Sequence, residues 1–211
     1  MFIELVDALR CPVPHEESWL VASAIRMESR HIVEGTLGCP VCAAEYPIHR
    51  GVVDFRGNAL APTARSAPGD SEQAMRLAAL LDLSDAHGFA VLLGEWGNHA
   101  LQLAAVTDVP LVLVDPSADM TGSPGISVVR SDGSLPLAAG AARATAIDCA
   151  DPARVASALR ATRAKGRIVA PVSVPVPSEV RELARDDTLW VGERDAPASP
   201  LVSLHVRRGQ D

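Results

Sequence analysis

The residues of this chain best suited to chemistry are cysteines and histidines gathered near its start. Three of the four cysteines and three of the six histidines precede residue 57. Cys39-Pro40-Val41-Cys42 is a C-x-x-C motif, which on a tight turn presents two thiolates to one tetrahedral metal ion. Upstream, Cys11-Pro12-Val13-Pro14-His15 offers a third sulfur and an imidazole nitrogen. We therefore predict a zinc site with the ligands Cys11, His15, Cys39 and Cys42.

Two alternatives to this zinc site stay open. In the first alternative, Cys11 and His15 are ordinary residues and the metal has been lost. A domain as small as residues 1–56 would then have little hydrophobic core to fold around. A redox role for the C-x-x-C motif is the second, and it is disfavoured because no thioredoxin-like strand and helix flank the motif. His31 and His49 are weaker candidates for the fourth ligand.

Composition limits the classes of protein to consider. A net charge of −7 argues against a protein that coats nucleic acid, since phosphate contacts need clustered Lys and Arg. The chain has no run of about 18 apolar residues, so we expect no membrane span. Its start, MFIELVDALRCP, has acids where a signal peptide has basic residues, which favours the cytoplasm. We interpret the local basic residues as a solvated helix face: Arg154, Arg160, Arg163, Lys165 and Arg167.

The elements that must position these residues change in character along the chain. Residues 57–70 are rich in Ala, Pro and Gly and read as a linker. Beyond them, apolar runs bounded by turn residues predict buried strands at 89–94, 110–115, 126–130, 144–148 and 167–172. Helical patterns cover 71–86, 97–106 and 152–164. A final pair, 188–194 and 201–208, is expected to close the sheet as an antiparallel hairpin.

This alternation predicts an α/β fold with a doubly wound, mostly parallel sheet and helices on both faces. The chain length of 211 residues suits one such domain plus a small appendage. The predicted organisation is a zinc-ribbon-like domain at 1–56, a linker at 57–70 and the α/β domain at 71–211.

A resemblance to a known family covers residues 1–56. LRCP near the start, followed by GTLGCPVCAAEYPIHRGVVDF at 35–55, resembles the small zinc-ribbon family that activates tRNA and release-factor methyltransferases. Cys11, Cys39 and Cys42 match three ligand positions of that family. Pro14 stands where the family has its second cysteine, and His15 is our substitute for it. The resemblance implies bound zinc and a methyltransferase as partner.

Residues 71–211 resemble a class I S-adenosylmethionine-dependent methyltransferase of Rossmann-like fold. The segment VLLGEWGNH (91–99) runs beside the family's Val-Leu-Asp-Leu-Gly-Cys-Gly-Asn-Gly, but only Gly97 falls on a family glycine. In that family an acid after the second strand binds the ribose, and one after the third meets the adenine. The resemblance implies that S-adenosylmethionine would be bound by Gly94, Glu95, Gly97, Asp115 and Asp132.

Two hypotheses for the function remain open. The degraded glycine loop and the lack of an acceptor-binding motif favour a catalytically degenerate protein, a pseudoenzyme that presents a surface to a protein partner. That partner would be another methyltransferase or a second copy of this chain. The alternative is an active S-adenosylmethionine-dependent methyltransferase with a divergent donor loop. A nicotinamide-dependent oxidoreductase would need the same glycines and explains the ribbon less well. No catalytic base stands out in the sequence, so the catalytic residues stay unknown.

Overall fold

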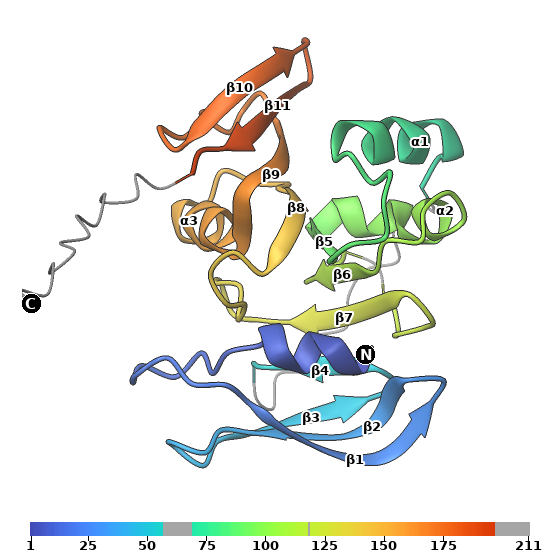
Figure 1. The fold of residues 1–211 in the computed structure, drawn as a ribbon, viewed down its shortest axis with the longest axis vertical. Helices are drawn as coiled ribbons and strands as arrows, with labels where there is room; N and C mark the ends of the chain where they lie inside the picture. The colour runs from blue at the N-terminus through green and yellow to red at the C-terminus, as the bar shows by residue number, and fades with distance from the viewer. Residues whose placement is uncertain (57–68, 118, 197–211) are drawn as a thin grey trace, which may run out of the picture.

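The computed structural model describes residues 1–56, 69–117 and 119–196. Its helices are the 3-10 helices η1 (Ile3–Ala8) and η2 (Gly94–His99) and the α-helices α1 (Ser71–Leu80), α2 (Ala100–Ala104) and α3 (Pro152–Ala161). Its strands are β1 (Val21–Glu28), β2 (His31–Gly38), β3 (Glu45–His49), β4 (Val52–Asp54), β5 (Ala90–Leu93), β6 (Leu111–Val114), β7 (Ile126–Arg130), β8 (Ala142–Ala146), β9 (Thr162–Pro171), β10 (Val180–Arg185) and β11 (Leu189–Arg194). All these strands join one sheet in the order β1-β2-β3-β4-β7-β6-β5-β8-β9-β11-β10 (Figure 1).

The sheet has an antiparallel part and a parallel part. β1 to β4 form an antiparallel meander, and β4 then runs parallel to β7. β7, β6, β5, β8 and β9 follow in parallel, in the 3-2-1-4-5 order of a doubly wound sheet. β11 and β10 close that end as an antiparallel hairpin. An α/β sheet with mixed strands is therefore present, but it is larger than a simple doubly wound sheet because β1 to β4 extend it.

Helices cover both faces of the parallel part. α1 and α2 cover one face, where Leu77 and Leu103 pack against strand residues such as Leu92. α3 and η1 cover the other face. β5 and β6 are consequently buried along their whole length, which explains why their sequences read as continuous apolar runs. None of the described helices is long and apolar enough to cross a membrane.

The first residues of the chain pack into the core beside the parallel strands. Leu5 and Leu9 are fully buried, and Leu9 bridges to Leu137 in the loop between β7 and β8. The Ala138 N–H donates to the Ala8 carbonyl oxygen at 2.8 Å. One hydrophobic cluster thus runs from η1 and the β1–β4 meander to α3. The predicted linker at 57–70 falls mostly on residues outside the described part, so the division into domains stays a prediction.

Several predicted helices are shorter in the structure. Asp70 caps α1 by accepting a hydrogen bond from the Glu72 N–H at 3.3 Å, as the predicted helix start requires. That helix ends at Leu80 rather than at residue 86. The predicted helix at 97–106 is divided between η2 and α2. Because both helices end early, the connections that lead into the amino ends of β5 and β6 are longer than predicted.

The predicted basic helix face is wrong. α3 ends at Ala161, and Thr162 already belongs to β9. Arg163, Lys165 and Arg167 therefore lie on a strand, where side chains do not follow a helical period. The predicted helix 152–164 extended too far because residues 162–164 include no Gly or Pro to mark its end.

The terminal hairpin involves a different pair of strands from the predicted one. β11 pairs with β9 on one edge and with β10 on the other, so both of its edges are taken. The predicted partner, 201–208, lies outside the described residues. β10 escaped prediction because its residues after Val180 are all exposed, which leaves no apolar alternation to read.

We expect Leu9→Ala to lower the free energy of unfolding by about 2–5 kcal/mol, because it leaves a cavity in the shared core. Urea unfolding followed by far-UV circular dichroism measures this, with Ile25→Ala, at an 84% exposed position, as the control. The shared core also predicts one transition for the whole chain. A separate transition for residues 1–56 at lower urea concentration would contradict this account. So would a free energy of unfolding that Leu9→Ala leaves unchanged.

Candidate metal centre and carboxyl-edge site

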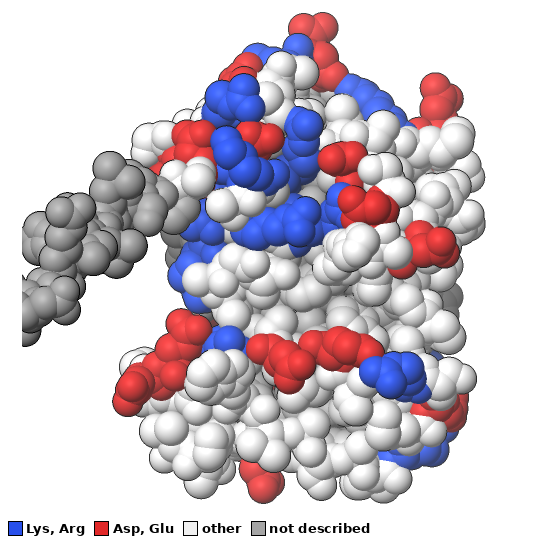
Figure 2. All heavy atoms as spheres, in the orientation of Figure 1, with Lys and Arg blue, Asp and Glu red and all other residues white. Residues whose placement is uncertain are grey.

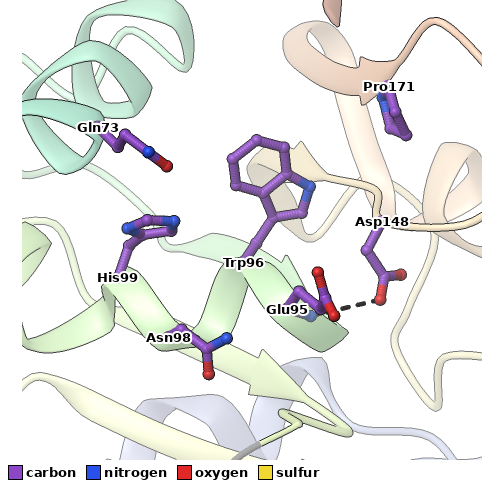
Figure 3. Close-up of a pocket in the computed structure, with 7 residues that line it drawn as sticks. All are labelled: Gln73, Glu95, Trp96, Asn98, His99, Asp148 and Pro171. Carbon is purple, nitrogen blue, oxygen red and sulfur yellow. Dashed lines mark hydrogen bonds between the residues drawn. The ribbon is translucent and has the colours of Figure 1, made fainter. Parts of the chain in front are cut away.

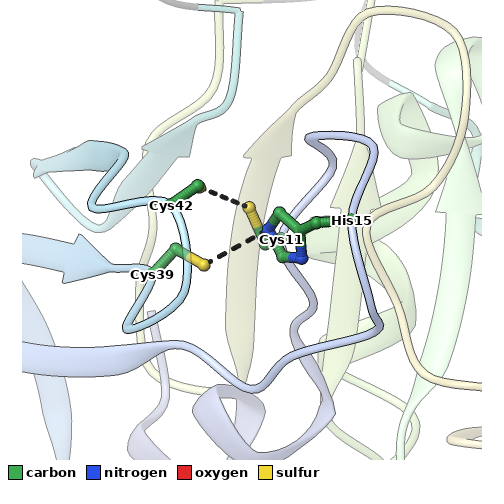
Figure 4. A group of neighbouring side chains, drawn as sticks. All are labelled: Cys11, His15, Cys39 and Cys42. Carbon is green, nitrogen blue, oxygen red and sulfur yellow. Dashed lines mark hydrogen bonds between the residues drawn. The ribbon is translucent and has the colours of Figure 1, made fainter.

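The structure brings all four predicted metal ligands together. Cys11 and His15 lie in the loop after η1, and Cys39 and Cys42 lie in the turn between β2 and β3. Their four ligand atoms all lie within 4.8 Å of one another. Figure 4 shows the two pairs facing each other across the space between these loops. Segments far apart in the sequence therefore supply one Cys3His cluster.

The spacing within the cluster suits a tetrahedral ion. The Cys11 and Cys42 sulfurs are 3.7 Å apart, and the Cys39 sulfur lies 3.4 Å from His15 Nε2. A zinc ion with Zn–S of about 2.3 Å and Zn–N of about 2.0 Å would separate two sulfurs by about 3.8 Å and a sulfur from a nitrogen by about 3.5 Å. These two distances therefore match those between ligands of one tetrahedral zinc ion.

Contacts with nearby backbone groups put His15 and Cys39 into the forms that bind a cation. His15 Nδ1 lies 2.5 Å from the Glu16 carbonyl oxygen, which fixes the proton on Nδ1 and turns the Nε2 lone pair toward the cluster. Burial raises the pKa of the Cys39 thiol, but the Cys42 and Val41 backbone N–H groups outweigh it and lower that pKa to about 6. A thiolate at neutral pH is the form that binds metal.

Tyr46 is a neighbour of the cluster that the ligand motif does not reveal. Its hydroxyl lies 3.2 Å from the Cys11 sulfur, and its ring packs against Phe55 with centroids 4.6 Å apart. Burial and then the neighbouring Cys11 raise the pKa of the Tyr46 hydroxyl, so it keeps its proton and can donate it to the sulfur. The tyrosine thus holds Cys11 in place from the β3 side.

A second group of predicted site residues lies at the carboxyl edge of the parallel strands. Gly94 follows β5 with a φ of +50°, and a Cβ there would come within 1.7 Å of Asp148 Oδ2. Asp148 follows β8 and accepts a hydrogen bond from the Glu95 N–H at 3.4 Å. The carboxylate of Asp148 therefore occupies the space next to the Gly94 backbone that the family resemblance assigned to the donor.

Gly97 serves close packing within the protein. A Cβ at Gly97 would come within 2.8 Å of the Pro116 side chain in the turn after β6. In the same turn, the Ser117 N–H donates to the Gly94 carbonyl oxygen at 3.4 Å. The loop after β5 and the turn after β6 thus touch each other across the position of the expected ligand.

Asp115 is engaged by its protein neighbours. Its carboxylate accepts hydrogen bonds from the Ser131 N–H at 2.9 Å and the Ser131 hydroxyl at 3.2 Å, and it forms an ion pair with Arg154 at 2.5 Å. These contacts hold Asp115 at a φ of +47°, which is strained for a residue with a side chain. Asp132 lies exposed in the loop after β7 and does not line the cavity described next.

A cavity of about 290 Å³ remains at the point where the strand order reverses between β5 and β8. In Figure 3, Trp96 stands in its middle, with Gln73 and His99 on one side and Asp148 and Pro171 on the other. The Trp96 indole N–H donates to the Ile147 carbonyl oxygen at 2.9 Å. His99 Nδ1 and Asp148 Oδ1 are buried without a hydrogen-bond partner among the described residues.

The sequence analysis predicted Glu95 as a site residue but did not predict the other residues that line this cavity. Among the predicted donor residues, Glu95 alone lines the cavity. The others that line it come from α1, η2 and the ends of β8 and β9, which meet only in the folded chain. They are Gln73, Trp96, Asn98, His99, Asp148 and Pro171.

Comparisons with known proteins yield only distant structural likeness. No family model and no curated protein matches the chain. It is similar to the antibiotic-resistance methyltransferase Kmr at 16% identity and a TM-score of 0.43, over 64% of this chain and 98% of Kmr. The putative methyltransferase yhhF from Escherichia coli is similar at 12% and 0.42, over 64% and 92%. MycE methyltransferase from the mycinamycin biosynthetic pathway, in complex with Mg and SAH, is similar at 11% and 0.41, over 68% and 54%. With TM-scores below 0.5, activity has to be inferred from this chain's own residues.

We expect the purified protein to carry about one zinc per chain, since four ligands complete one tetrahedral site. Cys42→Ser should remove most of the metal, whereas Cys149→Ser, which changes a thiol outside the cluster, should keep it. Elemental analysis after extensive dialysis measures the content. Full zinc in Cys42→Ser would exclude this site, and full zinc in His15→Ala would remove His15 from the ligand set.

We expect Tyr46→Phe to keep the fold but to weaken zinc binding by about 10- to 100-fold, because the Cys11 sulfur loses its hydrogen-bond donor. Competition with a chromogenic chelator measures the affinity. Phe retains the ring that packs on Phe55, so the circular dichroism spectrum of the zinc-loaded variant should match the unsubstituted protein. Equal zinc affinities would show that the hydroxyl does not support the site.

Proposed function

We propose that this protein is a methyltransferase-fold binding module with a structural zinc site, and that it is catalytically degenerate because its donor site is closed by its own side chains. The observation that carries the proposal is the Asp148 carboxylate lying against Gly94. A donor reaching the Gly94 backbone would have to displace this carboxylate and break its hydrogen bond with the Glu95 N–H. The strand order of the parallel part supports the fold assignment.

The engagement of Asp115 supports the same proposal. Binding a ribose there would exchange the contacts to Ser131 and Arg154 for contacts to the ligand. Hydrogen bonds to charged groups contribute about 1.5–3 kcal/mol each, so the exchange has little to gain. Asp115 then acts as a brace between the turn after β6, the end of β7 and α3.

Zinc fits this protein as a structural ion. Four protein ligands leave no open coordination position for a substrate or an activated water. A bound ion would tie the loop after η1 to the β2–β3 turn and so hold the meander against the rest of the sheet. The described cysteines are free thiols, which suits a cytoplasmic protein whose thiols stay reduced and available to metal.

A protein partner is the proposed target of the module. β1 is the outermost strand of the sheet, so one row of its backbone groups has no neighbouring strand among the described residues. Val21 is 63% exposed and Ile25 84% exposed on this strand, and Trp19 just before it is 65% exposed. An exposed edge with apolar side chains is suited to pairing with another chain, either a methyltransferase or a second copy.

The alternative is an active S-adenosylmethionine-dependent methyltransferase with a divergent donor loop. Its support is the cavity at the strand reversal, where His99 Nδ1 and Asp148 Oδ1 have no partner among the described residues. Buried polar atoms without partners are rare and often mark ligand sites. The cavity of about 290 Å³ lies at the lower end of the usual range for small-molecule pockets.

We expect no heat of binding when the protein is titrated with S-adenosylmethionine up to millimolar concentration, because Asp148 and Arg154 hold the closed arrangement. Isothermal titration calorimetry makes the measurement. Micromolar binding that Asp115→Ala abolishes would overturn the closed donor site on which the proposal rests and would favour the alternative. Asp119→Ala, at an exposed acid in the turn after β6, is the matched control for the loss of one charge.

A further inference from the structure

A cluster of basic side chains lies at the end of the sheet opposite β1. Figure 2 shows Lys and Arg gathered over the region where Figure 1 has α3, β9 and the β10–β11 hairpin. Contacts between strands connect its members: Arg167 is paired with Glu193, and Arg181 with Glu193, across adjacent strands. We call this cluster the basic edge, and it consists of Arg160, Arg163, Lys165, Arg167, Arg181 and Arg194.

An irregularity in β9 pushes part of the basic edge outward. Thr162 pairs with Ala142 and Arg167 with Ala144, so residues 163–166 of β9 lie opposite the single residue 143 of β8. Lys165 has a φ of +63° in this bulge. A Cβ on Gly166 would come within 2.6 Å of the Arg143 carbonyl oxygen, so the bulge depends on glycine there. The exposed Arg163 and Lys165 are therefore displayed by a built feature of the strand.

The basic edge has more positive than negative charge. Glu193 pairs with Lys165 at 3.3 Å and with Arg181 at 2.8 Å, and Glu17 lies 4.0 Å from Arg160. Asp195 is a further acid whose charge acts on Arg181. The guanidinium of Arg194 bonds to the carbonyl oxygen of Arg160 at 3.2 Å, which holds it beside α3. Within the described residues, Arg163 and Arg167 form no ion pair with a carboxylate.

The surroundings of the basic edge favour a nucleic acid over a protein as its partner. Protein interfaces centre on apolar and aromatic side chains. Residues 160–171 and 189–194, all of which the structure describes, expose no large hydrophobic side chain; Val172 and Leu183 nearby are 40% and 38% exposed. Interfaces with nucleic acids are polar and strongly positive, and arginine binds phosphate in a bidentate manner. The large exposed apolar residues Trp19, Val21 and Ile25 belong to the opposite end of the molecule.

We propose that the basic edge binds the phosphate backbone of a nucleic acid. This inference does not depend on whether the donor site is closed. It is compatible with the negative net charge, because the chain would contact nucleic acid over one face only and would not coat it. Binding through phosphates alone reads no sequence and falls steeply with salt.

Fluorescence anisotropy with a labelled 20-nucleotide single-stranded RNA and a 20-base-pair DNA duplex tests the proposal and separates the two sources of phosphate. We expect binding by at least one of them at 50 mM salt. The double variant Arg163→Ala/Lys165→Ala should weaken that binding about tenfold. It should also make the negative slope of log K against log salt less steep, by about 1.8 for a duplex or about 1.4 for a single strand.

The matched control is Arg26→Ala/Arg30→Ala, which removes the same charge from exposed ion pairs at the β1–β2 end. It should leave the affinity and the salt slope nearly unchanged, and equal melting temperatures would show that both double variants fold. Equal weakening by both variants, or no binding at 50 mM salt, would overturn the proposal. Tighter binding of polyglutamate than of either nucleic acid, compared at the same charge concentration, would instead assign the basic edge to an acidic protein.

Discussion

The parallel pairing of β4 with β7 is the contact on which the rest of this structure depends. Val52 pairs with Val128 and Asp54 with Arg130, so the cysteine-bearing meander continues the sheet of the α/β part. Because the sheet continues, its hydrophobic cluster also continues, from the meander through η1 to α3. The pairing also brings the end of β4 to the carboxyl edge, where Asp54 forms an ion pair with Arg56 at 2.8 Å. Together with the contacts of Ala8 and Leu9 to the loop between β7 and β8, the pairing fixes the position of the Cys/His cluster relative to the carboxyl edge.

Two carboxylates at the carboxyl edge already make contacts within the protein. Asp115 pairs with Arg154, and the Asp148 carboxylate lies over Gly94 and accepts the Glu95 N–H. A partly buried charge that already has its partner gains little from exchanging it for a ligand, since desolvation has to be offset again. We therefore propose that partners bind at the surface, where the apolar side chains of β1 and the basic edge lie at opposite ends of the sheet.

Local sequence patterns predicted those features that depend on neighbours along the chain. The buried parallel strands read as short apolar runs, and β7 begins and ends at the predicted residues 126–130. Two of the three predicted helices begin at the predicted residues, Ser71 and Pro152. The C-x-x-C motif, with Cys11 and His15 upstream, indicated a four-ligand cluster, because metal chemistry restricts ligand types and spacing so strongly. β10 stayed hidden, since five exposed residues in a strand give no apolar period.

By itself, then, the sequence determined most of the strand-forming runs, the starts of α1 and α3, and the four side chains that form the Cys/His cluster. Only the tertiary structure decided that the meander joins the sheet, that Asp148 lies against Gly94, and that Lys165 projects from a bulge in β9. The physical reason is the same in each case. Strand partners and contacts between loops are chosen by hydrogen bonding and packing between segments far apart in the chain, and no local pattern records which segments will meet.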